Sequence, residues 1–169
     1  MIYVAYGLTF INYVFYCSSR YMKKKEHMLL FDMIAKIVTT ISFLLLNSKT
    51  GMFNMVLAFM LILYNYVEEK KETTSKTQDI IIFTIATSIY VIILLLTYSN
   101  ISSILVFATS IISLISNQFL SPQKMRLTGI FNSILYLTYQ LTLKNWAGLL
   151  EIIVIISNLT SWLKYKKET

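Results

Sequence analysis

The sequence contains seven long apolar segments, and the last three repeat the lengths and breaks of the first three about 97 residues later. At a rise of about 1.5 Å per residue, helices of about 17–20 residues are long enough to cross roughly 30 Å of hydrocarbon. The segments are continuously apolar rather than alternating, which favours helices, because backbone groups in lipid must be hydrogen-bonded within the segment. The sequence therefore predicts an all-α integral membrane protein with seven transmembrane helices.

The repeat predicts how these helices are organised. The first set covers residues 2–19, 27–46 and 51–67, the second covers 101–119, 124–143 and 147–165, and residues 80–98 lie between them. The shared offset aligns Gly51 with Gly148, Met28 with Met125, Leu46 with Leu143 and Lys70 with Lys167. We expect two parallel three-helix repeats, residues 1–67 and 101–169, joined by a charged linker and a fourth span, residues 68–100. This 3+1+3 plan is typical of transporters whose repeats face each other around a site near mid-membrane.

Composition leaves little outside the membrane. The hydrophobic fraction is 56%, the mean hydropathy is +0.64, and there are only four glycines and one proline. A chain of 169 residues with seven such segments has no room for a separate soluble catalytic domain. The polar stretch 68–79 is expected to be a solvated linker between the first repeat and the fourth span.

The net charge of +7 follows from an uneven distribution of basic residues rather than from a nucleic-acid partner. Of the 15 Lys and Arg residues, only Lys49 and Lys144 fall on one side of the predicted spans, and Lys36 lies inside a span. The other twelve fall on the opposite side: Arg20, Lys23, Lys24, Lys25, Lys70, Lys71, Lys76, Lys124, Arg126, Lys164, Lys166 and Lys167. The positive-inside rule then predicts an outside N-terminus and a cytoplasmic C-terminus.

Two charged residues lie within the second span. Asp32 and Lys36 have the i,i+4 spacing that places both side chains on one face of a helix. Charged groups inside the membrane are costly and mark functional sites by default. One interpretation is a proton or substrate-charge relay that faces a cavity. The other is a self-neutralising pair that locks helix packing.

The third and seventh spans carry polar groups at matching positions. Glu151 lies about one turn into the seventh span and Asn158 follows on the same stripe, while Asn54 is the repeat equivalent of Glu151. An unpaired carboxylate in lipid costs on the order of 3 kcal/mol, so Glu151 is expected to face protein or water. One interpretation is that these residues line a cavity between the repeats. The other is that Glu151 is an interfacial anchor, and that Asn54 and Asn158 form hydrogen bonds with neighbouring helices.

The sixth span adds a stripe of Ser133, Tyr136 and Gln140, flanked by Asn132. Hydroxyl and amide groups beside an aromatic ring suit a neutral polar ligand such as a sugar or a nucleoside. The same groups also hold neighbouring transmembrane helices together by hydrogen bonds. Both interpretations are open at this stage.

The sequence carries no enzyme signature. His27 is the only histidine and stands beside the basic loop, with no carboxylate or cysteine cluster at metal-ligand spacing. Cys17 is the only cysteine, which excludes an internal disulfide and a thiolate metal cluster. We therefore expect neither an enzymatic activity nor a cofactor.

The stretch 120–162 resembles the bacterial YgjV-type inner-membrane family. The matching features are Lys124, Arg126, Asn132, Trp146, Ala147, Gly148, Glu151 and Asn158. The resemblance implies an inner-membrane protein of seven spans without an established substrate. More remotely, the plan is similar to the SWEET and PQ-loop transporters, although their hinge prolines are missing here and the one Pro-Gln pair, Pro122-Gln123, lies in a loop.

These patterns predict a permease for a small neutral polar solute, sugar- or nucleoside-like, in the bacterial inner membrane. The expected partners are the lipid bilayer and the solute, without nucleic acid, and the sequence is compatible with a homo-oligomer. The alternative is a membrane interaction or envelope-stress protein that keeps a transporter-like fold without transport. The residues expected to line the solute site are Asn54, Glu151, Asn158, Tyr136, Lys36, Asp32, Asn132 and Gln140.

Overall fold

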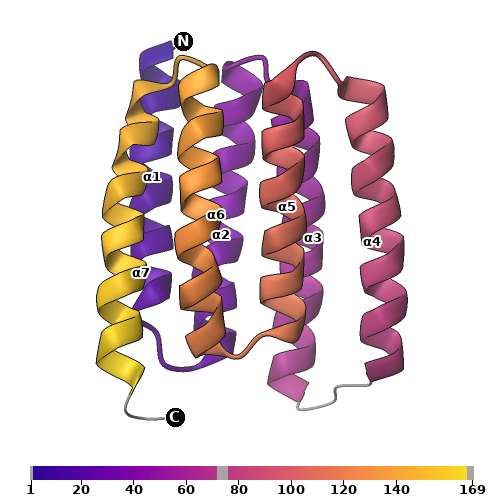
Figure 1. The fold of residues 1–169 in the computed structure, drawn as a ribbon, viewed down its shortest axis with the longest axis vertical. Helices are drawn as coiled ribbons and strands as arrows, with labels where there is room; N and C mark the ends of the chain where they lie inside the picture. The colour runs from indigo at the N-terminus through magenta and orange to yellow at the C-terminus, as the bar shows by residue number, and fades with distance from the viewer. Residues whose placement is uncertain (1, 72–75, 167–169) are drawn as a thin grey trace.

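The computed structural model describes residues 2–71 and 76–166, with side chains from residue 3 onward, and the part it describes is all-helical (Figure 1). Its α-helices are α1 (Ile2–Arg20), α2 (Lys25–Leu45), α3 (Lys49–Lys71), α4 (Lys76–Thr97), α5 (Ile101–Phe119), α6 (Pro122–Thr142) and α7 (Glu151–Tyr165). A short 3-10 helix, η1 (Trp146–Leu150), leads directly into α7. Each of the seven predicted segments therefore lies in helical structure to within one residue at its end.

The helices form two rows of three, with α4 at one edge (Figure 1). Helices α1, α2 and α3 make one row, and α5, α6 and α7 make the other. The rows meet at both sides, because α3 packs against α5 and α1 packs against α7. Helix α4 packs against α3 and α5 and has the smallest buried share of the candidate spans, at 11%. Consecutive helices alternate in direction. Because the helices stand in two rows, the interior of the bundle lies between the rows.

The bundle has two distinct ends. The N-terminus marks one of them, at the top of Figure 1, and we call it the N-terminal end. The opposite end carries the connections after α1 and α5 together with the end of α7. Most of the Lys and Arg residues lie there, so we call it the basic end.

The turns at the N-terminal end have well-defined helix caps. The C-caps of α2 and α6 are Leu46 and Leu143, and the next residues, Asn47 and Lys144, have positive φ of 54° and 55°. One residue in the left-handed region is a common way to end a helix. At α5, the Asn100 side chain caps the helix by accepting a hydrogen bond of 2.8 Å from the Ser102 backbone N–H.

Five helical segments are long and apolar enough to cross a membrane, judged by length and composition. They are α2, α3, α4, α5 and the continuous segment Trp146–Tyr165. Helices α1 and α6 are not among them. Helix α1 is rich in tyrosine, and α6 carries two basic residues and several amides, which lowers the apolar character of both.

The polar stretch 68–79, expected to be a loop, is helical over most of its length, and none of its described residues is buried. Helix α3 continues to Lys71 and α4 begins at Lys76. Residues 72–75 lie outside the described residues. So do residues 167–169, at the end of the predicted second repeat. The Tyr64 hydroxyl donates a hydrogen bond to the Glu68 carboxylate one turn along α3. Glu and Lys are good helix formers, so polar character here does not end the helix.

Candidate functional site

The interior of the bundle is unusually polar. Among the described residues, 25 buried residues are polar or charged, and 17 are apolar or aromatic. Large apolar side chains point outward instead, including Leu95 and Leu96 on α4, which are 74% and 80% exposed. A soluble protein shows the opposite distribution. This distribution suits a bundle in lipid, whose polar side chains must face one another or an internal cavity.

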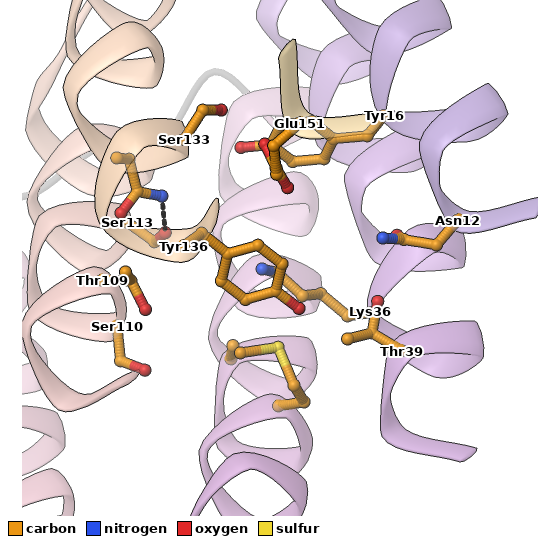
Figure 2. Close-up of a pocket in the computed structure, with 13 residues that line it drawn as sticks. Asn12, Tyr16, Lys36, Thr39, Thr109, Ser110, Ser113, Ser133, Tyr136 and Glu151 are labelled. Atoms are coloured by element: carbon orange, nitrogen blue, oxygen red, sulfur yellow. Dashed lines mark hydrogen bonds between the residues drawn. The ribbon is translucent and has the colours of Figure 1, made fainter. Parts of the chain in front are cut away.

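A polar cavity lies between the two rows (Figure 2). The volume in which the centre of a water-sized sphere fits is about 30 Å³. All six helices of the two rows contribute to its wall, and no described residue of α4 does. We call it the central cavity, and its lining residues are Asn12, Tyr16, Lys36, Thr39, Met55, Ala58, Thr109, Ser110, Ser113, Asn132, Ser133, Tyr136 and Glu151. This volume holds about two water molecules, since one needs roughly 10–15 Å³ by this measure.

Two opposite charges enter the central cavity from different rows. Lys36 reaches in from α2, and Glu151 enters from the first turn of α7 (Figure 2). Glu151 is only 4% exposed, so it does not reach the bundle surface as an interfacial anchor would. The Ser133 and Tyr13 side chains lie near Glu151, yet its Oε2 atom and the Tyr13 hydroxyl have no hydrogen-bond partner among the described residues. Lys36 makes no salt bridge within 4.0 Å in the part of the chain that the structure describes.

Asp32 does not pair with Lys36, which corrects the simplest expectation from their spacing. Its Oδ2 atom lies 2.5 Å from an Nη atom of Arg20, and both side chains are 3% exposed. A four-residue connection makes α1 and α2 antiparallel neighbours, which brings the last residue of α1 beside the second turn of α2. The planar guanidinium of Arg20 then binds the carboxylate, and it also stacks over Tyr16 at 4.3 Å.

The Arg20–Asp32 pair lines a second, smaller cavity toward the basic end. Its volume, measured in the same way, is about 10 Å³. We call it the ion-pair cavity. It shares four wall residues with the central cavity: Tyr16, Lys36, Ser113 and Asn132. Asn132 donates a hydrogen bond of 3.0 Å to the Ser113 hydroxyl, drawn as a dashed line in Figure 2. The two cavities are therefore adjacent compartments separated by one polar layer.

A third cavity, of about 280 Å³, opens at the N-terminal end. It is lined mainly by hydroxyl and amide residues: Asn47, Ser48, Lys49, Thr50, Thr97, Ser99, Asn100, Ser102, Ser103, Tyr139 and Leu143. We call it the end cavity. Tyr139 in its wall also belongs to an apolar cluster with Phe43, Met55 and Val106. Met55 lines the central cavity as well, so this cluster lies between the two cavities.

A second apolar cluster closes the basic side. It consists of Met28, Leu29, Ile62 and Met125, and Met125 also lines the ion-pair cavity. Nearby, the Arg126 side chain donates hydrogen bonds to the backbone carbonyls of Arg20 and Met22, at 2.9 and 2.6 Å. These bonds hold the start of α6 against the α1–α2 connection, so the two rows are joined firmly at the basic end.

The other predicted site residues fall in different places. Tyr136 and Asn132 line the central cavity with Lys36 and Glu151, and Asp32 lines the ion-pair cavity. Asn54, Asn158 and Gln140 line none of the three cavities.

Each of these three amides has a packing position of its own. The Gln140 side-chain carbonyl accepts a hydrogen bond of 2.9 Å from Asn145, in the turn before η1. Asn158 packs against Gly129 and donates to the Val154 carbonyl within its own helix. Asn54 is fully buried, and neither polar atom of its side chain has a partner among the described residues. A helical stripe fixes which residues share a face, but not which neighbour that face meets.

Several lining residues were not anticipated. Asn12 and Tyr16 come from α1, and Thr109, Ser110 and Ser113 come from α5. Single hydroxyls in an apolar helix give a weak signal, because they are often satisfied by their own backbone, as Ser110 is by the Val106 carbonyl at 2.8 Å. No group of three His, Cys, Asp or Glu able to hold a metal ion occurs within residues 2–71 and 76–166.

Comparison with known proteins identifies the family. A family model described as Imp-YgjV, bacterial inner membrane protein, matches residues 3–169. Neither the curated proteins nor the solved structures contain a match to the chain. The helical bundle, its apolar exterior and this match over nearly the whole sequence agree with one another. The chain therefore belongs to the Imp-YgjV family of bacterial inner membrane proteins and is a multi-pass helical membrane protein.

Proposed function

We propose that this protein is a permease for a small, net-neutral polar solute that binds in the central cavity between two three-helix repeats. In this proposal all seven helices cross the membrane, α4 links the repeats, and the basic end faces the cytoplasm. The proposal includes no enzymatic step. The observation that carries it is the make-up of the cavity wall.

Eight of the residues that line the central cavity form four pairs whose numbers differ by 97. They are Asn12 with Thr109, Tyr16 with Ser113, Lys36 with Ser133, and Thr39 with Tyr136. The same offset aligns the two sets of apolar segments in the sequence. A cavity lined by equivalent positions from both repeats lies on the axis that relates them, which is where repeat-built transporters bind their substrates.

The backbone supports the same equivalence. Helices α2 and α6 begin and end at residues 97 apart, and so do the starts of α3 and η1. Asn47 and Lys144, the two non-glycine residues of positive φ in the described chain, are also 97 apart. Local sequence does not demand this agreement, because Asn and Lys differ greatly in their preference for that conformation.

The order of compartments suits a solute path. From the N-terminal end it runs through the end cavity, the Phe43–Tyr139 cluster, the central cavity, the polar layer and the ion-pair cavity, and finishes at the Met28–Met125 cluster. The apolar clusters are the natural closures on the two sides. Alternating access would open one cluster while the other stays packed.

The polar composition of α1 and α6 fits this plan. These helices place Asn12, Tyr16, Asn132, Ser133 and Tyr136 on the central cavity. A helix that contributes to a polar cavity needs fewer apolar residues than one surrounded by lipid. We therefore include both among the spans, although composition alone selects five.

One observation favours the alternative, a membrane interaction or envelope-stress protein that does not transport. The central cavity has room for about two waters, and apolar clusters close it on both sides. A solute would enter only after one cluster opens. The same experiment tests both functions.

The test is uptake into proteoliposomes. Purified protein is reconstituted, and entry of labelled glycerol, ribose, uridine and glycine is compared with protein-free liposomes. We expect at least one solute to enter faster and with saturable kinetics. Equal entry of every solute into both kinds of liposome would contradict the permease and favour the alternative.

A matched pair of variants ties the uptake to the cavity. Ser133→Leu adds bulk at a wall residue of the central cavity, and Ser88→Leu makes the same change at an exposed position of α4. We expect Ser133→Leu to abolish uptake and Ser88→Leu to leave it unchanged, with melting temperatures showing that both variants are folded. Normal uptake by Ser133→Leu would place the solute path elsewhere.

A further inference from the structure

The central cavity holds one positive and one negative side chain that do not bond to each other. Lys36 projects from α2 in one row, and Glu151 projects from α7 in the other (Figure 2). They are more than 4.0 Å apart, whereas Arg20 and Asp32 in the neighbouring cavity are 2.5 Å apart. Arg20 and Asp32 therefore neutralise each other by direct contact, whereas Glu151 and Lys36, which lines both cavities, do not.

Unpaired charges at this depth are costly. A buried ion is stable only when an opposite charge or several hydrogen bonds compensate its lost hydration. Glu151 lines the central cavity, is 4% exposed, and its buried Oε2 atom has no partner among the described residues, so an ionised carboxylate at this position lacks full compensation. About two waters are the most that the cavity can add.

The charges restrict which solutes suit this site. A cation would pair with Glu151 but would be repelled by Lys36, and an anion would meet the reverse problem. An uncharged polyol would leave both ionic groups unpaired. A molecule that carries both an ammonium and a carboxylate group pairs with both Glu151 and Lys36, while its own net charge is zero.

We propose that the central cavity binds a small zwitterion of the amino-acid type, with its ammonium group at Glu151 and its carboxylate group at Lys36. This inference rests on the proposed function and narrows its substrate class. The rest of the wall is mainly hydroxyl and amide groups, with Met55 and Ala58 as its aliphatic members. Such a wall fits a ligand with little or no apolar side chain.

The two charges also give the cavity a direction. The repeat equivalent of Lys36 is Ser133, and that of Glu151 is Asn54, so neither charge has a charged counterpart in the other repeat. Equivalent backbone positions thus form a symmetric frame with an asymmetric charge pattern. A zwitterion would bind in one orientation, whereas an uncharged polyol would have no such preference.

The first experiment measures melting of the purified protein in detergent with matched small molecules. Glycine, β-alanine and γ-aminobutyrate are the zwitterions, ethanolamine is the cation, glycolate is the anion, and glycerol and ribose are uncharged. We expect at least one zwitterion to raise the melting temperature by about 5–10 °C at roughly one hundred times its dissociation constant. The single-charge and uncharged molecules should give no comparable shift.

The second experiment exchanges the charge preference. Glu151→Gln removes the negative group from the cavity wall and should make glycolate the stabilising ligand. Lys36→Met removes the positive group and should make ethanolamine the stabilising ligand. Glu26→Gln and Lys70→Met are matched changes outside all three cavities and should keep the zwitterion preference. A purely structural role for either residue would change the melting temperature without exchanging the preferred ligand. If one variant does not fold, the other variant and the wild-type panel still give a decision.

The outcomes separate this inference from the permease proposal. A melting shift and saturable uptake with ribose or glycerol, but with no zwitterion, would overturn the zwitterion site and leave the permease standing. Zwitterion binding without uptake would support the site and contradict the permease. No shift with any zwitterion, or unchanged ligand preference in both charge variants, would overturn the inference.

Discussion

Four charged side chains meet in the interior of the bundle, and only two of them are bonded to each other. Arg20 and Asp32 form the buried pair, and Lys36 and Glu151 face the central cavity. The i,i+4 rule correctly places Asp32 and Lys36 close together, since both line the ion-pair cavity. It cannot reveal Arg20, whose approach depends on how α1 packs against α2.

Removing one partner of the buried pair should be worse than removing both. We expect Asp32→Leu or Arg20→Met alone to cost about 3–5 kcal/mol, because a buried charge loses its partner, and the double variant to cost clearly less than the sum. Thermal melting of the purified protein in a double-mutant cycle measures this coupling.

A second double-mutant cycle pairs Asp32 with Lys36 and serves as the comparison. Because Lys36 makes no salt bridge with Asp32 within 4.0 Å, Lys36→Met and Asp32→Leu should couple more weakly than Arg20→Met and Asp32→Leu. A coupling larger for Lys36 than for Arg20 would show that the carboxylate changes partners in the membrane.

How far the sequence predicts the site depends on the kind of residue. Lys36, Glu151 and Tyr136 are charged or aromatic groups deep in apolar segments, and the cost of burying them correctly marks them as interior. Tyr16 also lines the central cavity, but in a tyrosine-rich helix it does not stand out. Asn158 shares a stripe with Glu151 yet packs on Gly129, because that part of α7 meets α6 instead of the cavity.

At the scale of elements, the contact between consecutive helices depends on two glycines at equivalent turns. A Cβ atom at Gly51 would lie 2.4 Å from the Tyr139 hydroxyl and 2.8 Å from a Phe43 ring carbon. A Cβ atom at Gly148 would lie 2.3 Å from Cβ of Gln140. Phe43 and Gln140 are themselves 97 residues apart, so each glycine admits the equivalent residue of the preceding helix. Close helix approach, and not a left-handed turn, explains both glycines, since neither has positive φ.

Alanine at either glycine should therefore destabilise the bundle. We expect Gly51→Ala and Gly148→Ala each to cost about 1–3 kcal/mol, the usual range for overpacking, in thermal melting. Gly7→Ala is the control, because nothing lies within 4 Å of a Cβ atom there. It should be neutral or stabilising by up to about 1 kcal/mol, since Ala is the better helix former. Equal effects at all three positions would show that close helix approach does not explain the glycines.

The helices themselves are the part of the fold that sequence predicts best. Continuous apolar segments have only one stable form in lipid. The Pro122-Gln123 pair, expected in a loop, is instead the start of α6, where proline is favoured because the first helical N–H needs no partner. The extension of α3 through Lys71 is not predicted, because charged residues at the end of an apolar segment suit both a helix and a loop. The 3-10 geometry of η1 also has no clear signal in the sequence.

At the scale of the whole molecule, the distribution of charge predicts the orientation in the membrane. The basic end carries most of the Lys and Arg residues, and the N-terminal end carries Lys49 and Lys144. We expect a fluorescent protein fused to the C-terminus to fluoresce in bacterial cells, because it folds in the cytoplasm. Alkaline phosphatase, which is active outside, should be active when fused after Asn100 and inactive at the C-terminus. Active phosphatase at the C-terminus would reverse the orientation.

The central claim is that a solute reaches the cavity between the rows from both sides of the membrane. Cysteine accessibility tests it without knowledge of the solute. On a Cys17→Ser background, Ser110→Cys places a thiol on the central cavity, and Ser88→Cys places one at mid-length of α4 on the exposed surface of the bundle. A negatively charged, membrane-impermeant thiol reagent is applied to intact spheroplasts and, separately, to inside-out vesicles. We predict that Ser110→Cys reacts from both sides and Ser88→Cys from neither, whereas a Ser110→Cys thiol that reacts from one side only, or not at all, would contradict alternating access.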